Sequence, residues 1–341
     1  MVKKTIHMII MAMLSFGFLY FFLKSVQWEH MPDYLADMDI KYFIAFVLLT
    51  PVHLATRAIR WNYLLVHQKP DISFFSRFAG NAVGFTVTYI FPGRLGELVK
   101  PMYLARKEKI PNGFVLGTVV VERIFDIFTI CFLLGGFFLL KPFYPALLSV
   151  NQQTYSHVYV SGVIGLSLAC MMLVVTLALY FFKKKTLIAV GFLLKPFPKQ
   201  LSIKIETFFN EFVDGLKIFH SIKNLLMYIF MSFVVWICII TYFWLFFLAY
   251  HISAPFLLCF PYTFLLLVGA SIPTPGMVGG FHYFSKLGMM SLLNIEETLA
   301  VGMTLVLHAV QVVVICLIGF FVLWKDGVSF FQIIRLNNNR L

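Results

Sequence analysis

Long apolar runs joined by short connections are the feature that most constrains this chain. The runs occupy residues 6–23, 42–66, 74–92, 113–140, 158–182, 225–250, 256–272, 277–293 and 298–324. A helix crosses the hydrocarbon core of a bilayer in about 20 apolar residues. Only 12% of the 341 residues are charged, whereas soluble domains carry about 25%. The sequence therefore predicts an all-α integral membrane protein with a single polytopic domain over 1–341.

The distribution of basic residues indicates how the runs cross the membrane, because Lys and Arg concentrate in cytoplasmic loops. Lys3 and Lys4 precede the first run, and Lys325 follows the last one. No small-residue cleavage site follows run 6–23, so we expect an uncleaved span and not a secretory signal. We predict a protein of the cytoplasmic membrane with both termini cytoplasmic. The six full spans that we expect are 6–23, 42–66, 113–140, 158–182, 225–250 and 298–324.

Two segments do not fit full crossings. Run 74–92 has basic clusters at both ends, which favours a re-entrant hairpin that enters from the cytoplasm. Runs 256–272 and 277–293 are joined by a Pro- and Gly-containing hinge and begin and end outside, so they are either two short spans or a second hairpin. The expected hinge residues of the two hairpins are Pro92, Gly93, Pro273, Pro275, Gly276 and Gly279.

The two hairpins are related in sequence. The segment 91–97, Phe-Pro-Gly-Arg-Leu-Gly-Glu, resembles the segment 274–280, Thr-Pro-Gly-Met-Val-Gly-Gly. The units 40–140 and 225–324 would then be repeats that enter the membrane from opposite sides. Inverted repeats of this kind are typical of secondary transporters, in which broken elements of the two halves meet near the midplane.

The segment 183–224 is Lys-rich and is predicted to be cytoplasmic. Within it, Phe208, Phe212, Leu216 and Phe219 recur at helical spacing. This pattern indicates an amphipathic helix, which either lies in the membrane interface or covers the inner face of the bundle.

Charged residues cluster within the apolar part of the chain, where each costs about 2.5–3.5 kcal/mol on insertion scales. Such charges usually pair or line a pathway, so each has a structural and a functional interpretation. Arg94 would either bind a headgroup or pair with an acid. Arg57 and Arg60 would bind the same headgroup or extend to the interface. The predicted headgroup-binding residues are Arg57, Arg60, Arg94 and Lys100. The predicted charge-pairing or coupling residues are Glu97, Glu122, Arg123 and Asp126.

Four motifs in order along the chain resemble the flippase-like family, also described as the lysylphosphatidylglycerol synthase transmembrane region. The residues that carry this resemblance are Arg57-Ala58-Ile59-Arg60-Trp61, Asn81, Pro92-Gly93-Arg94-Leu95-Gly96-Glu97, Val121-Glu122-Arg123-Ile124-Phe125-Asp126 and Pro273-Thr274-Pro275-Gly276. The resemblance covers nearly the whole chain. The family includes the membrane half of the bacterial multiple peptide resistance factor. The resemblance implies lipid translocation between leaflets.

Two departures limit what the resemblance carries over. Full-length members add a cytosolic aminoacyl-transferase domain, which this sequence lacks, so we do not expect synthase activity. The family usually places a Glu shortly after the second Pro-Gly, but no acidic residue follows Gly276 here until Glu296. This weakens the expectation of a lysyl-lipid substrate.

Other classes of function lack a signature in the sequence. No nucleophile with an adjacent base, nucleotide loop or metal motif occurs, so we expect neither an enzyme nor a cofactor. Asn81 and His282 are expected to be polar lining residues, and His282 has no second ligand at helical spacing. The net charge of +12 favours anionic membrane lipid over nucleic acid as the partner. The sequence leaves open whether the protein forms a homo-oligomer.

The leading hypothesis is a flippase that moves an anionic or aminoacylated phospholipid, or a polyprenyl-phosphate lipid, between leaflets. One alternative is a secondary transporter of a small anionic solute with the same inverted repeat. The other is a membrane-embedded transferase that uses a lipid carrier, for which Glu97 is the candidate carboxylate.

Overall fold

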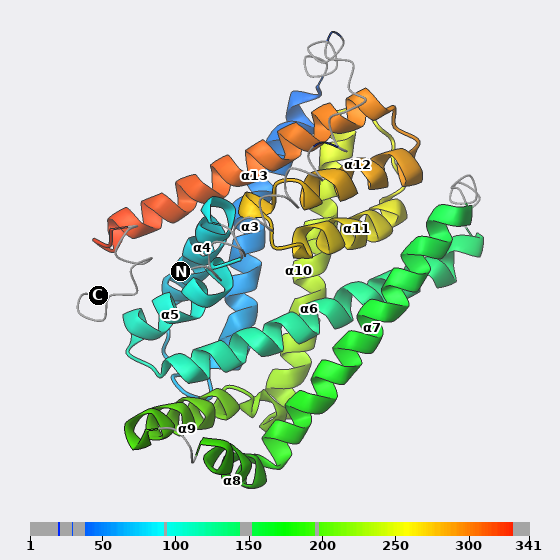
Figure 1. Cartoon of the computed structure of the whole chain (residues 1–341). Helices are drawn as coiled ribbons and strands as arrows, with labels where there is room; N and C mark the ends of the chain where they lie inside the picture. Colours follow the sequence, from blue (N-terminus) through cyan, green and yellow to red (C-terminus); the bar gives the residue numbers. More distant parts are fainter. Residues whose placement is uncertain are drawn as a thin grey trace.

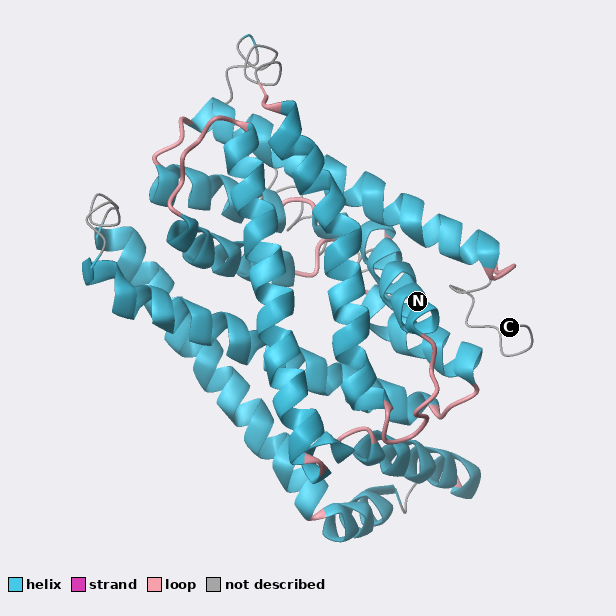
Figure 2. Cartoon of the chain, turned by 180° about the vertical axis from the view of Figure 1, so that it is seen from behind, coloured by secondary structure: helices cyan, strands magenta, loops and turns pink. Residues whose placement is uncertain are grey.

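The computed structural model of the chain describes residues 20, 29, 38–91, 94–143, 152–194 and 198–329. This part of the chain is helical throughout and contains no strand (Figures 1 and 2). The α-helices are α3 (Ile40–Leu65), α4 (Phe74–Ile90), α5 (Gly96–Glu108), α6 (Asn112–Leu140), α7 (Gln152–Phe181), α8 (Lys183–Leu194), α9 (Lys199–Asp214), α10 (Ile222–Ala249), α11 (Cys259–Ser271), α12 (Gly280–Leu293) and α13 (Glu297–Lys325).

Five helices are long and apolar enough to cross a membrane, namely α3, α6, α7, α10 and α13. They coincide with five of the six spans that the apolar runs predict. Of the predicted first span, 6–23, the described residues include only Tyr20. The long apolar helices confirm the predicted all-α membrane fold.

Helices α4 and α5 form the first hairpin. The predicted run 74–92 supplies only its first helix, α4, and α5 follows beyond the end of that run. The two helices cross closely at Gly84 and Gly96, where a Cβ atom on Gly96 would lie only 1.8 Å from the Gly84 carbonyl oxygen. The Lys69 ammonium, just before α4, donates to the Glu108 carboxylate at the end of α5, with 2.7 Å between Nζ and Oε2. Both ends of the hairpin therefore lie on the same side of the molecule, as a re-entrant element requires. The predicted hinge residues Pro92 and Gly93 lie outside the described residues.

Helices α11 and α12 form the second hairpin, with a short 3₁₀ turn at Pro275–Met277 between them. Gly276 has φ of 58°, a left-handed conformation that glycine adopts without steric cost. The two helices cross at Gly269 and Gly280, where an added Cβ on Gly280 would lie 2.5 Å from the Gly269 carbonyl oxygen. Helix α11 has 13 residues and is therefore about 20 Å long, too short to cross a core of about 30 Å. Of the two alternatives for 256–293, the structure favours the hairpin.

The two halves of the described chain repeat the same order of elements, a long helix, a hairpin and a long helix. The first long helices, α3 and α10, lie antiparallel. The Asp39 amide before α3 donates to the Ala249 carbonyl at the end of α10 (2.8 Å), and Asn224 near the start of α10 lies 3.4 Å from His67 after α3. The last long helix of each half packs on the hairpin of the other half: α13 packs on α4, and α6 packs on α11.

The tips of the two hairpins meet inside the bundle. Helix α4 contacts the 3₁₀ turn of the second hairpin, and a Cβ on Gly276 would lie 2.8 Å from the Tyr89 carbonyl oxygen. Figure 1 shows this meeting point between the long helices α3, α6, α10 and α13.

The predicted cytoplasmic segment 183–224 forms α8, α9 and a 3₁₀ turn at Lys217–His220. Helix α9 packs closely on α6, since a Cβ on Gly117 would lie 2.3 Å from the Phe212 carbonyl oxygen. The helix therefore contacts the bundle, but it also exposes Leu201, Ile203 and Phe208, so its placement in the membrane interface stays a prediction. The helix is shorter than the apolar pattern predicts. It ends at Asp214, and Leu216 and Ile218 reach the core from the turn that follows.

Candidate functional site

Three helices bring the intramembrane charges of the first half together. Helix α3 carries Arg57 and Arg60 three residues apart, and α6 carries Glu122 and Asp126 four residues apart. Residues three or four apart lie on one face of a helix, so each helix presents its charges as a pair. The described residues of this cluster form two layers that differ in exposure.

The deep layer consists of ion pairs that hold α3, α5 and α6 together. The Arg60 guanidinium, which is fully buried, donates to Glu122 (Nη2 to Oε1, 3.0 Å) and to Asp126 (Nη1 to Oδ1, 2.6 Å). The Lys100 ammonium donates to the second oxygen of Glu122. Because each carboxylate faces a cation, these buried charges compensate one another.

Neighbouring polar side chains complete this layer. The Trp236 indole of α10 donates to Asp126 (Nε1 to Oδ1, 3.2 Å), and the Ser232 hydroxyl lies 3.3 Å from Arg60 Nη1. Lys100 Nζ also lies 4.3 Å from the centre of the Trp61 ring, a cation–π contact. The deep layer thus joins α10 to the three helices that carry the charges.

The second layer is accessible. The side chains of Arg94, Glu97 and Arg123 are exposed to 29%, 33% and 31%. Arg123 bridges the layers, because its Nη2 lies 3.2 Å from Asp126 Oδ2 and its Nε lies 3.5 Å from Glu97 Oε2. This layer is therefore partly available to a ligand, whereas the deep layer is not.

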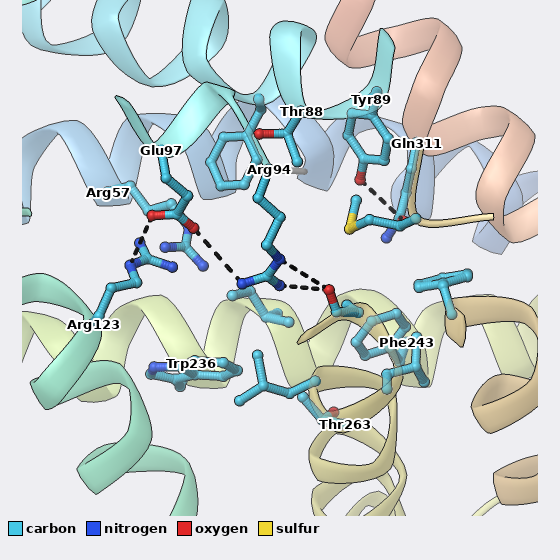
Figure 3. A pocket seen from close by; sticks show the side chains of 17 residues that line it. Arg57, Thr88, Tyr89, Arg94, Glu97, Arg123, Trp236, Phe243, Thr263 and Gln311 are labelled. Carbon is cyan, nitrogen blue, oxygen red and sulfur yellow. Dashed lines mark hydrogen bonds and ion pairs between the residues drawn. The ribbon is translucent and has the colours of Figure 1, made fainter. Parts of the chain in front are cut away.

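Arg94 joins the two hairpins. Its Nε and Nη2 donate to the Ala270 carbonyl oxygen near the end of α11, at 3.1 Å and 2.6 Å. Its Nη1 lies 3.9 Å from Glu97 Oε1. The backbone of Arg94 has φ of 53°, in the left-handed region that non-glycine residues seldom adopt. Figure 3 shows its side chain extending from the first hairpin to the second.

A cavity of about 160 Å³ lies where the hairpins meet α6 and α10. Three arginines, Arg57, Arg94 and Arg123, line it together with one acid, Glu97 (Figure 3). The remaining walls are mostly aromatic or aliphatic, with Trp236 among them. The uncharged polar side chains of Thr88, Tyr89 and Gln311 also border the cavity. Charge is therefore confined to one part of an otherwise apolar surface.

The described charges of this region do not balance. The cations are Arg57, Arg60, Arg94, Lys100 and Arg123, and the carboxylates are Glu97, Glu122 and Asp126. Arg57 is the least satisfied by hydrogen bonds, and its ion pair with Asp126 is long (Nη1 to Oδ2, 3.6 Å). Within the described residues, Nε and Nη1 of Arg57 are buried and have no hydrogen-bond partner. A bound anion would supply the missing charge and acceptor oxygens.

The structure separates the four predicted headgroup residues into two groups. Arg57 and Arg94 line the cavity. Arg60 and Lys100 do not line it, because both are buried and bound to Glu122. Lys100 borders only a smaller space beside Glu97 and Arg123. Arg123, which the sequence suggests only as a pairing residue, occupies the cavity wall in their place.

The two predicted polar lining residues lie away from the cavity. The Asn81 amide donates to the Arg77 carbonyl within α4 (3.0 Å). His282 accepts from the Gly279 amide at Nδ1 (3.4 Å), and its Nε2 lies 3.2 Å from Nδ1 of His308. These two imidazoles form a buried polar pair behind the tip of the second hairpin.

The sequence did not predict that α10, or Thr50 and His53 of α3, would contribute to this region of the structure. Trp236 and Ser232 lie in a strongly apolar helix and have no local signal. Thr50, His53 and Arg57 do carry one, because they recur at positions i, i+3 and i+7 and therefore share a face of α3. The Ala270 carbonyl that Arg94 binds is a backbone group and leaves no trace in the side-chain pattern.

Comparisons with known proteins agree with this architecture. A segment of 135 residues is 28% identical to UPF0104 membrane protein MJ1595 of Methanocaldococcus jannaschii, and the alignment covers 38% of this chain and 40% of that protein. No solved structure matches the chain. Residues 8–319 match the family described as the lysylphosphatidylglycerol synthase TM region. Because this match covers most of the 341 residues, the chain belongs to that family of membrane proteins.

Proposed function

We propose that the protein moves lipids with an anionic headgroup between the leaflets of the cell membrane. The observation that carries this proposal is the excess of positive charge in a cavity whose other walls are largely apolar. Arg57, Arg94 and Arg123 would bind the phosphate of the headgroup. The acyl or prenyl tails would stay in the surrounding lipid.

The chemistry of the cavity favours phosphate. Guanidinium groups form forked, charge-assisted hydrogen bonds with phosphate oxygens, and Arg is more weakly hydrated than Lys. A headgroup that leaves water must exchange its hydration for such bonds, because unpaired charge is costly in a membrane interior. Glu97 would keep Arg94 and Arg123 in place between transport cycles, since it lies within 3.9 Å of both guanidinium groups.

Membrane orientation follows the positive-inside rule. We place the ends of the first hairpin, near Lys69 and Lys109, and both termini on the cytoplasmic side, and the turn near Ser253 outside. Single cysteines introduced at Asp71 and Ser253, both exposed, should react with an impermeant thiol reagent from opposite sides. Reaction of both from the same side would contradict this orientation.

Leaflet exchange in reconstituted vesicles tests the function. Purified protein would be placed in vesicles with a fluorescent phosphatidylglycerol, and dithionite would report the lipid that reaches the outer leaflet. Arg94→Gln removes the charge but keeps a hydrogen-bond donor for the Ala270 carbonyl. We expect at least about a tenfold lower rate, since hydrogen bonds to charged groups contribute about 1.5–3 kcal/mol.

The matched control is Arg106→Gln, on the same hairpin but outside the cavity. It should exchange lipid at the wild-type rate, and both variants should have a wild-type Tm. Full exchange by Arg94→Gln would overturn the assignment of the cavity. Uptake of free phosphate without lipid exchange would favour a transporter of small anions, and turnover of a lipid-linked donor would favour the transferase.

A further inference from the structure

A second, smaller recess adjoins the arginine-lined cavity. It has a volume of about 80 Å³ and shares Phe85, Tyr89 and Gln311 with the larger cavity. Thr50, His53 and Tyr242 line the rest of its polar surface. No Asp, Glu, Lys or Arg belongs to its described lining. The recess is therefore a neutral, hydrogen-bonding extension of a cationic site.

Two hydroxyl groups in this recess lack partners. The side chains of Thr50 and Tyr242 belong to residues that are only 1% and 5% exposed. Among the described residues, neither hydroxyl has a hydrogen-bond partner. The Tyr242 hydroxyl faces Thr50 and Gln311, but not within normal hydrogen-bond geometry. Buried polar groups in proteins are nearly always satisfied, so these hydroxyl groups retain hydrogen-bonding capacity for a ligand or water in the recess that they line.

The recess presents both donors and acceptors. His53 Nδ1 lies 2.9 Å from the Thr50 carbonyl oxygen, which can only accept, so Nδ1 carries the proton and Nε2 is left as an acceptor. Gln311 Oε1 accepts from the Tyr89 hydroxyl (3.5 Å), which leaves the Gln311 amide as a donor. Hydroxyl groups match this mixture because each can donate and accept.

The position of the recess relates it to the phosphate site. His53 and Arg57 are four residues apart on α3, so their side chains are neighbours at about 5–6 Å between Cβ atoms. A phosphate bound at Arg57 would place the substituent on its other ester oxygen near His53. A water needs only about 10–15 Å³ of such space, so a recess of about 80 Å³ holds a group of several heavy atoms.

We propose that this recess binds the hydroxyl groups of an uncharged, glycerol-like substituent on the headgroup phosphate, and selects such lipids over lipids whose headgroup carries an amine. The proposal rests on the proposed function and names the class of its substrate. An ammonium group has three donors and no acceptor. The recess offers it acceptors such as His53 Nε2, but it would bring positive charge close to the Arg57 guanidinium of the adjoining cavity, with no lining carboxylate to compensate it.

Binding measured in detergent tests this selectivity without requiring transport. Native mass spectrometry of the full chain would compare phosphatidylglycerol, phosphatidylpropanol and phosphatidylethanolamine with the same acyl chains. Phosphatidylpropanol has the same single charge on a phosphodiester but no hydroxyl, so we expect the wild type to bind phosphatidylglycerol about two- to tenfold more tightly, the effect of one net hydrogen bond or more. Phosphatidylethanolamine should bind the most weakly.

Two variants assign the effect to the recess. Tyr242→Phe and Thr50→Val each remove one hydroxyl with little change in size, and should lower the preference for phosphatidylglycerol while leaving the binding of phosphatidylpropanol unaffected. Tyr250→Phe is the matched control, because Tyr250 follows the same helix and its hydroxyl is also buried without a described partner. It does not line the recess and should keep the wild-type preference.

Equal binding of phosphatidylglycerol and phosphatidylpropanol by the wild type would overturn the proposal, because the recess would then hold only water. An unchanged preference in Tyr242→Phe and Thr50→Val would also overturn it. Selective binding without leaflet exchange would support the recess and contradict the flippase function. Tight binding and vesicle uptake of free glycerol phosphate would support the recess but identify the soluble ester, and not the lipid, as the source of the group.

Discussion

The two hairpins share a backbone design and differ in their chemistry. In both, two short helices cross at a pair of glycines, Gly84 with Gly96 and Gly269 with Gly280. The first hairpin carries Arg94, Glu97 and Lys100 just after its tip. The second carries no Asp, Glu, Lys or Arg from Ser271 to Ser285. A nearly symmetric frame thus holds an asymmetric site.

This difference indicates a division of roles. The first hairpin supplies charge, and its Arg94 is held by a backbone carbonyl of the second. The second hairpin supplies apolar walls through Leu266, Met277 and Phe281. A glycine crossing in each hairpin lets its two helices pack closely. In the proposed function, the unequal chemistry would give a headgroup one preferred orientation between the hairpins.

The largest expected effect comes from removing the acid that anchors the charged hairpin. Glu122→Gln leaves Arg60 and Lys100 without their shared carboxylate in a fully buried position. Breaking a buried ion pair on one side costs about 3–5 kcal/mol, so we expect a strongly lowered Tm or loss of monodisperse protein in size-exclusion chromatography.

The matched variant is Glu97→Gln, in the accessible layer. Its closest ion-pair contacts are at 3.5 Å and 3.9 Å, and exposed pairs contribute at most about 1 kcal/mol. It should fold normally. Adding Lys100→Met to Glu122→Gln should recover part of the lost stability. Equal stability of the two Glu variants would show that the layers do not differ as described.

The next largest effect on stability is expected at the two glycine crossings. Gly96→Ala would place a Cβ 1.8 Å from the Gly84 carbonyl oxygen, whereas Gly280→Ala would place one 2.5 Å from that of Gly269. Overpacking costs about 1–3 kcal/mol, and we expect Gly96→Ala to lower the Tm more than Gly280→Ala. Gly135→Ala is the control, since an added Cβ there meets nothing within 4 Å. The reverse order would indicate that the first hairpin tolerates separation of its helices better than the second.

The smallest effect concerns the open end of the first hairpin. Burial raises the pKa of Glu108, but the Lys69 ammonium outweighs it, so the pKa is lowered below the ordinary value of 4.5. A carboxyl group whose pKa is lowered on folding contributes full stability above its unfolded-state pKa. This contribution is lost as the pH falls through the lower pKa of the folded state. Lys69→Met should therefore lower the Tm by less than about 2 °C at pH 7, and the difference should shrink below pH 4.5. A pH-independent difference, or an equal effect of Lys109→Met, would contradict this role.

The sequence predicts much of this fold because membrane insertion requires long apolar helices and backbone hydrogen bonds within each segment. The same constraint makes the hairpins visible, since Pro and Gly interrupt the apolar runs at residues 92–93 and 273–276. The clustering of Arg57, Glu122 and Arg94 also follows from their positions at membrane depth.

The partners within the cluster could not be predicted. Arg60 lies 66 residues from Asp126 and 172 from Ser232 along the chain, and only the packing of α3, α6 and α10 brings them together. The exposure of Arg123 depends on the same packing. Helix periodicity defines the face of α3 that carries Thr50 and His53, but the facing Tyr242 belongs to a helix that is apolar on all sides.

The central claim is that a lipid phosphate is bound between the hairpins by Arg57 together with the two more exposed arginines, Arg94 and Arg123. Cryo-electron microscopy of the protein in nanodiscs of brominated phosphatidylglycerol tests it most directly, since bromine scattering marks the acyl chains. We expect headgroup density in the cavity within hydrogen-bond distance of these guanidinium groups, with brominated tails extending into the surrounding lipid. A cavity that contains only water, with every lipid headgroup at the membrane surface, would contradict this account.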